Sequence, residues 1–139
     1  MTVALLRWVW EAPQSLLGLA NLGRELALRN VRSVERREGR FLVELRSSSA
    51  VSLGFFVFFT RVDSRFVRVN PDNDRHEWGH ARQSALLGPL YLPIVGVPSV
   101  LRALYAVAQW TVTREPWDGY YDGFPENWAD RLGGVERGR

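Results

Sequence analysis

The sequence predicts an α+β fold in which a short antiparallel sheet packs on a central helix and on further helices. Apolar residues recur at helical spacing near the N-terminus, short strand-like runs fill residues 31–70, and helical patterns return after that. The chain has 139 residues and 46% hydrophobic residues, which suits one domain, residues 1–139, with its own core. It has no cysteine, so disulfides and thiolate metal sites are excluded.

The first half of the chain is expected to form helices and then strands. Residues 4–28 are apolar at helical spacing, and Pro13 should divide them into a short entry segment and a longer helix. Residues 31–45 predict a β-hairpin, because two strand-like arms flank a Glu-Gly turn signal. Residues 51–59, rich in Val and Phe, predict one buried strand, and the alternation over residues 65–70 predicts another.

The second half is expected to be helical. Residues 71–74 form a loop with helix-capping chemistry, so a helix should follow over residues 75–87. Another helix should open at Pro98 and run toward Trp110. A loop rich in Tyr and Gly follows at residues 114–123, and a short last helix is expected over residues 125–132.

The segment from Ala85 to Val112 raises the question of membrane contact. Its only charged residue is Arg102, and it is long enough to cross a bilayer. Pro89, Pro93 and Pro98 interrupt it, so we expect two buried or interfacial pieces. A hairpin embedded in the membrane is the less favoured alternative.

The charge pattern argues against a nucleic-acid partner. The net charge is only +3, every basic residue is Arg, and there is no zinc-finger spacing, RNP pattern or basic heptad helix. No signal peptide is expected, because Arg7 and Glu11 interrupt the first apolar run. We therefore expect a cytoplasmic protein, with association to a membrane surface left open.

A possible metal site lies in the segment His76-Glu77-Trp78-Gly79-His80. Residues four apart share one face of a helix, so both imidazoles can reach a single ion. Glu77 then lies beside the metal-bound water, where a general base is needed. The chain contains only two His, and both belong to this pattern, which makes a chance match less plausible. The pattern predicts bound Zn²⁺.

A third ligand must be a carboxylate, since catalytic zinc takes three protein ligands and no third His exists. Glu126 is favoured, because Glu126 and Asp130 are four apart on the last predicted helix. One can bind the metal while the other orients an imidazole. The alternative is a solvent-facing helix whose first acid is favoured by the helix dipole. The other downstream acids are Glu115, Asp118, Asp122 and Glu136.

This pattern resembles the gluzincin metallopeptidases, the thermolysin-like group and its small members. The resemblance implies a small zincin-like domain in which His76, His80 and Glu126 hold zinc, Glu77 is the base and Asp130 supports an imidazole. Gln83 stands where the metzincins have Gly, and the chain is too short for the second lobe of a large gluzincin.

A second resemblance covers more of the chain. It is to a group of small bacterial proteins that contain the HEWGH motif, and it implies no function. It is carried by Ser52-Leu53-Gly54, the HEWGH motif, Gln83-Ser84, Leu87-Gly88-Pro89-Leu90-Tyr91 and Gly96-Val97-Pro98-Ser99.

The predicted activity is zinc-dependent hydrolysis of a peptide bond in a peptide or protein substrate. Tyr120 and Tyr121, on the loop before Glu126, are the best-placed donors to an oxyanion, although a turn with aromatic packing explains them as well. One alternative is a structural or regulatory protein that holds zinc without turnover. Another is a peripheral membrane or partner-binding protein that works through the segment from Ala85 to Val112. The sequence does not predict the oligomeric state.

Overall fold

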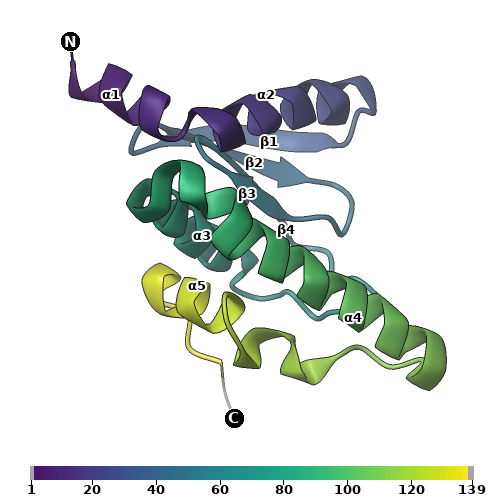
Figure 1. The fold of residues 1–139 in the computed structure, drawn as a ribbon. Coiled ribbons are helices and arrows are strands. Elements are labelled where there is room, and N and C mark those ends of the chain that lie inside the picture. Colours follow the sequence, from purple (N-terminus) through teal and green to yellow (C-terminus); the bar gives the residue numbers. More distant parts are fainter. Residues whose placement is uncertain (1, 138–139) are drawn as a thin grey trace.

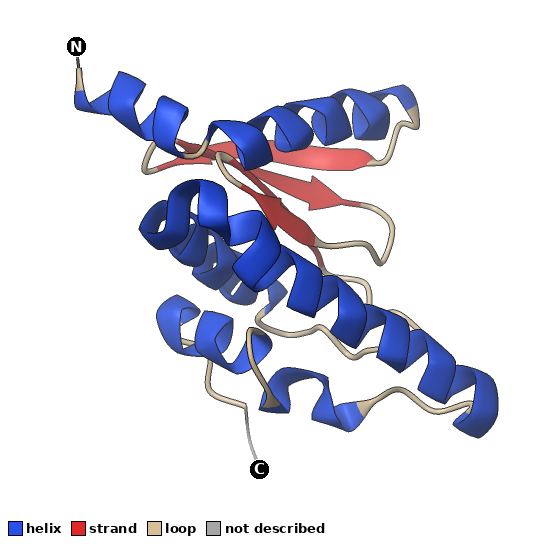
Figure 2. Ribbon diagram, in the orientation of Figure 1, coloured by secondary structure: helices blue, strands red, loops and turns tan. Residues whose placement is uncertain are grey.

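A computed structural model describes residues 2–137 and contains a mixed sheet surrounded by helices (Figures 1 and 2). In chain order the elements are α1 (Val3–Trp10), α2 (Ala12–Ala27), β1 (Val31–Arg37), β2 (Arg40–Leu45), β3 (Val51–Leu53), β4 (Phe56–Thr60), α3 (Asn73–Leu87), η1 (Gly88–Leu90), η2 (Leu92–Gly96), α4 (Val97–Thr113), η3 (Asp118–Asp122) and α5 (Glu126–Gly133). The predicted α+β class is confirmed.

The sheet has the strand order β1-β2-β4-β3. It is mixed rather than purely antiparallel, so this part of the prediction is wrong. Strands β1 and β2 form the predicted hairpin, and β3 and β4 form a second antiparallel pair. Between them, β2 and β4 run parallel, with Phe41 opposite Phe56 and Leu45 opposite Thr60. All five residues of β4 are buried, so the central position suits this apolar strand and leaves the short β3 at the edge.

Two helices cover the two faces of the sheet. On the α2 face, Val43, Leu45, Phe56 and Phe58 form a cluster against Leu22. On the other face, Leu42, Val57, Phe59 and Ala81 of α3 pack together with Trp78. Figure 1 shows α2 on one side of the strands and α3 on the other. The sheet thereby fixes the position of the helix that carries both His.

Two strand predictions need correction. Residues 51–59 form two strands rather than one, because Gly54 turns the chain with a φ of +63°. Residues 65–70 form no strand. Asp63 accepts hydrogen bonds from the amides of Val69 and Asn70, and Ser64 accepts from two neighbouring amides. These local hydrogen bonds give the backbone amides acceptors within the segment, so the segment forms a loop without pairing to a neighbouring strand.

Between Ala85 and Val112 we expect two buried or interfacial pieces; the division at Pro98 and the burial are wrong, whereas contact with a membrane interface stays a prediction. After the short turn η1, η2 and α4 continue as one helix from Leu92 to Thr113, 22 residues that are apolar and long enough to cross a membrane. Most of its side chains are exposed. Pro93 and Pro98 lie in the first turns of η2 and α4, where a missing amide hydrogen is tolerated, so they do not break the helix.

Candidate metal centre

The metal centre depends on a close approach between α3 and α5. A Cβ atom added to Gly79 would overlap the backbone carbonyl of Ala129, and one added to Gly133 would overlap the carbonyl of Arg75. The two backbones therefore touch directly, which a larger residue at either position would prevent. This contact brings the first turn of α5 opposite the imidazoles of α3, and it accounts for the Gly within the HEWGH motif.

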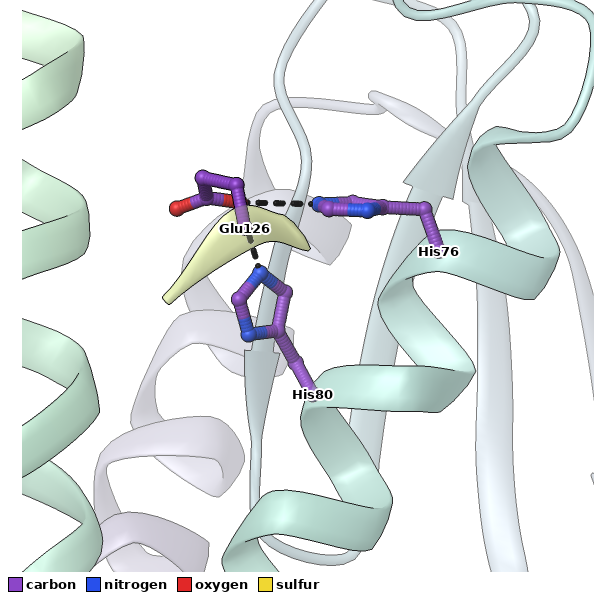
Figure 3. A group of neighbouring side chains, drawn as sticks. All are labelled: His76, His80 and Glu126. Atoms are coloured by element: carbon purple, nitrogen blue, oxygen red, sulfur yellow. Dashed lines mark hydrogen bonds and ion pairs between the residues drawn. The ribbon is translucent and has the colours of Figure 1, made fainter. Parts of the chain in front are cut away.

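His76, His80 and Glu126 meet at one point. The Nε2 atoms of His76 and His80 each lie 2.9 Å from the same oxygen, Oε2 of Glu126. Figure 3 shows the carboxylate of Glu126 facing both rings. One ligand atom from each residue lies within 4.8 Å of the others, and all three side chains are buried, at 2%, 5% and 0% exposure. Two imidazoles and a carboxylate are a donor set typical of zinc.

Neighbouring side chains orient both imidazoles. Nδ1 of His76 lies 2.7 Å from Oδ1 of Asp130, and Nδ1 of His80 lies 2.7 Å from Oε1 of Gln83. The amide of Gln83 is fixed because its Nε2 donates to the carbonyl of Pro125 at 3.1 Å. With Nδ1–H of each ring donated to these oxygens, each neutral imidazole directs the lone pair of its Nε2 at the carboxylate of Glu126.

The two Nε2 lone pairs and the Glu126 carboxylate all face one point, so a positive charge at that point would stabilise the group. Buried lone pairs facing a carboxylate are unfavourable unless a cation or added protons lie among them. Burial alone would lower the pKa of His76, but the hydrogen bonds to Asp130 and Glu126 raise this pKa to about 9. Burial likewise opposes ionisation of Glu126, yet when protons rather than a metal supply the positive charge, the charge of His80 and the hydrogen bonds that both protonated imidazoles donate hold the pKa of Glu126 below its usual range. The residues thus fit a bound metal ion.

Glu77 lies beside this group. It is buried, and burial raises the pKa of its carboxyl above the usual value. The side chain of Asn73 bonds to Glu77 and also accepts a hydrogen bond from the amide of Thr60 at the end of β4. Within residues 2–137, the oxygen Oε2 of Glu77 has no hydrogen-bond partner. An orphaned carboxylate oxygen next to a metal-ligand set is available to a water molecule or a substrate.

Both tyrosines named from the sequence reach the site. The ring of Tyr121 packs edge-on against His76 with 4.9 Å between centroids, and the guanidinium of Arg137 covers Tyr121. Tyr120 hydrogen-bonds Ser99, whose Oγ donates to Oε1 of Glu126 at 2.5 Å. Burial raises the pKa of both tyrosine hydroxyls, so both remain protonated donors.

Four residues that sequence reasoning missed complete the surroundings: Asn73, Gln83, Ser99 and Arg137. Arg137 holds Asp130 through two hydrogen bonds, of 2.6 and 3.0 Å. Gln83 could have been found, because it lies three residues after His80 on the same helix. Asn73 could also have been found, because it lies four residues before Glu77 on the same helix. Ser99 carries no local signal, since tertiary packing alone brings it to the site. The other downstream acids named above do not belong to the metal-ligand group among the described residues.

A cavity of about 690 Å³ opens onto the metal centre. His76, Glu77, His80 and Glu126 lie in its wall together with both tyrosines. Its other walls are the edge strand β3, the loop over residues 64–69 and the inner side of α4. Most of these walls are apolar side chains, such as Val51, Leu53, Val67 and Val107. The volume is typical of a site for a small ligand or a short peptide segment.

The chain matches no protein-family model, no curated protein and no solved structure in these three comparisons. No family is therefore identified, and the likeness to gluzincins rests on the motif and on the geometry of His76, His80 and Glu126. The structure and the comparisons together give a buried group, held between α3 and α5, that can bind a metal ion.

Proposed function

We propose that the protein is a zinc-dependent peptidase that hydrolyses peptide bonds in the cavity beside α4. The observation that carries this proposal is the position of Glu77, whose orphaned carboxylate oxygen adjoins a buried His-His-Glu ligand set and faces a cavity. A site that only held a metal would not need, besides the ligand Glu126, another carboxylate with an unpartnered oxygen at this position.

In the proposed reaction, Glu77 is the general base and acid. A zinc ion held by His76, His80 and Glu126 would supply Lewis-acid polarisation of the scissile carbonyl and a lowered pKa of water. Glu77 accepts the proton of the attacking water and gives it to the leaving amine. The raised pKa of Glu77, caused by its burial, favours the first step, in which the carboxylate takes up the proton, and Asn73 fixes the direction of its carboxylate.

The tyrosines take different roles in this proposal. Tyr120 is the preferred donor to the developing oxyanion, because its hydroxyl stays protonated and its side chain lies in the cavity wall with Glu126. Ser99 donates its own proton to Glu126, so Tyr120 gives up its hydrogen bond to Ser99 when it donates to the oxyanion. Tyr121 supports the ring of His76 by packing and is a positioning residue.

An extended peptide is the substrate that the cavity fits best. Strand β3 forms one wall and is an edge strand, so it can pair with the backbone of an extended segment. The apolar walls favour uncharged side chains near the scissile bond.

The substitution Glu77→Gln tests the proposal. We expect peptide hydrolysis to fall by about 10²–10⁴-fold, because the general base is lost, while one zinc per chain is retained. Activity would be followed by mass spectrometry of a mixed peptide library, and zinc by elemental analysis. Glu115→Gln, at an exposed acid outside the ligand group, is the matched control and should leave both unchanged. Full activity in Glu77→Gln would contradict the assignment.

A non-catalytic role is the second candidate, and one observation favours it. The three ligands join α3 to α5, so a bound metal would also fasten the last helix to the core. A zinc-loaded protein that cleaves no member of the library, and that unfolds when zinc is chelated, would support this candidate instead.

A further inference from the structure

We propose that the outer side of α4 binds the surface of a lipid bilayer that contains anionic headgroups, with the helix lying in the plane of the membrane. The relevant side chains are large, apolar and exposed, and we call them the α4 apolar face. They are Leu104 and Val112 of α4, Leu90 and Ile94 of the preceding turns η1 and η2, and Val97 and Leu101, which are exposed and also border the cavity. A monomeric soluble protein rarely exposes so long an apolar strip.

The outer side of α4 carries no charge over the whole helix. Arg102 is the only charged residue between Leu92 and Thr113, and it points inward. Its guanidinium donates to the carbonyls of Gly119 and Tyr120 at 2.7 to 2.9 Å and lies 4.8 Å from the ring centroid of Trp117. Water therefore meets only uncharged side chains along a helix whose length matches the roughly 30 Å scale of a bilayer core.

The C-terminal end of this helix has the composition of a membrane interface. Trp110 lies on the same side of the helix as Ser99 and Arg102 and is half-buried, with its ring edge-on to Phe66. The guanidinium groups of Arg65 and Arg114 lie 5.3 Å and 4.5 Å from this ring at the margin of the apolar face. Tyr105, which is exposed, packs on Trp117 one turn earlier. Aromatic rings and arginines gather where apolar chains meet headgroups, because each combines an apolar body with a polar tip.

The N-terminal helices extend the apolar surface and bring positive charge to it. Trp10 of α1 donates to the carbonyl of Ala85, close to the start of η1, at 3.0 Å. The α1 helix has no buried residue and exposes Val, Leu and Trp side chains. Among residues 2–30, the exposed charges are all Arg, whereas Glu11 and Glu25 are buried. This imbalance favours anionic lipid over a neutral partner.

A surface position fits the structure better than a membrane-spanning one. The inner side of α4 carries Ser99 and Arg102, which bond to Glu126 and to the loop before α5, and it forms a wall of the cavity. One side of the helix is therefore committed to the protein, and only the other can enter lipid. A second copy of this chain is the competing occupant, but it would not account for the arginines around Trp110 or the acid-free surface of residues 2–30.

Sedimentation of the full chain with vesicles tests this inference. The probe is a 3:1 mixture of phosphatidylcholine and phosphatidylglycerol, with pure phosphatidylcholine vesicles as a comparison. We expect binding to the anionic vesicles, and at least about a tenfold weaker partition for the double substitution Leu104→Glu and Val112→Glu, because each charge replaces a buried apolar contact. Both residues are exposed, at 59% and 84%, and neither lies in the cavity wall.

The matched control is Val34→Glu, which changes a side chain that is 52% exposed on β1, the sheet edge opposite β3. It should bind vesicles as the unchanged chain does. Absence of vesicle binding by the unchanged chain, or equal binding by the double variant, would overturn the inference. So would a dimer in light scattering that the double variant dissociates while no vesicles are bound. Quenching of tryptophan fluorescence by brominated lipid tests directly whether tryptophan side chains of the unchanged chain contact lipid. No quenching would count against the proposal.

Discussion

Replacement of Gly79 by alanine is expected to separate α5 from α3 and to destabilise the protein by about 3 kcal/mol or more. The added Cβ would overlap the carbonyl of Ala129, which belongs to a helix backbone and cannot move alone. When α5 shifts, Glu126 leaves the two imidazoles, so zinc binding should be lost with the stability. Thermal unfolding with and without zinc, followed by circular dichroism, measures both effects.

Gly23→Ala is the matched control for this substitution. Gly23 lies within α2, and a Cβ at this position would have no neighbour within 4 Å. Alanine should stabilise the exposed helix by roughly 0.5–1 kcal/mol, because it restricts the unfolded chain and favours helix. A Gly79→Ala protein as stable as the unchanged chain would refute the account of the contact between α3 and α5.

Substitution of Glu126 by alanine should reduce bound zinc from one per chain to near zero. The carboxylate is the proposed third ligand of a group that could hold a metal ion, and two imidazoles alone would form an incomplete set. Asp130→Asn should have a smaller effect, a loss of about 10–100-fold in zinc affinity, because it disturbs only the partner that orients His76. Competition with a chromophoric chelator measures both affinities.

Glu115→Ala provides the control for these two substitutions, since Glu115 is exposed and lies outside the ligand group. Its zinc affinity should equal that of the unchanged chain. If Glu126→Ala bound zinc as tightly as the unchanged chain does, Glu126 would not be a ligand and the site would have to be built from other residues.

The ligand set could be predicted because the chemistry constrained it strongly. The spacing of His76 and His80 placed both on one helical face, and the absence of any other His required a carboxylate. The spacing of Glu126 and Asp130, four residues apart on one helix, then favoured Glu126 as the carboxylate ligand. Ser99 was missed because its contact with Glu126 depends on how α4 and α5 pack, whereas Gln83 contacts His80 within α3 and could have been found from its spacing.

The errors in the predicted fold have physical causes. Local sequence pattern does not encode strand order, so the parallel pairing of β2 with β4 could not be anticipated. The apolar run over residues 51–59 predicts one continuous strand, because its pattern does not show that Gly54 turns the chain. The apolar segment from Ala85 to Val112 predicts buried or interfacial pieces, and the prediction of burial is wrong, because most of α4 is exposed. That error is itself informative, since the exposed apolar helix underlies the membrane inference.

The central claim is that His76, His80 and Glu126 hold one metal ion between α3 and α5. Anomalous diffraction at the zinc edge, from crystals of the zinc-loaded protein, tests it most directly. We predict one peak within about 2.0–2.2 Å of Nε2 of His76, Nε2 of His80 and a carboxylate oxygen of Glu126. A protein that takes up no zinc, or a peak bound by other residues, would contradict the claim.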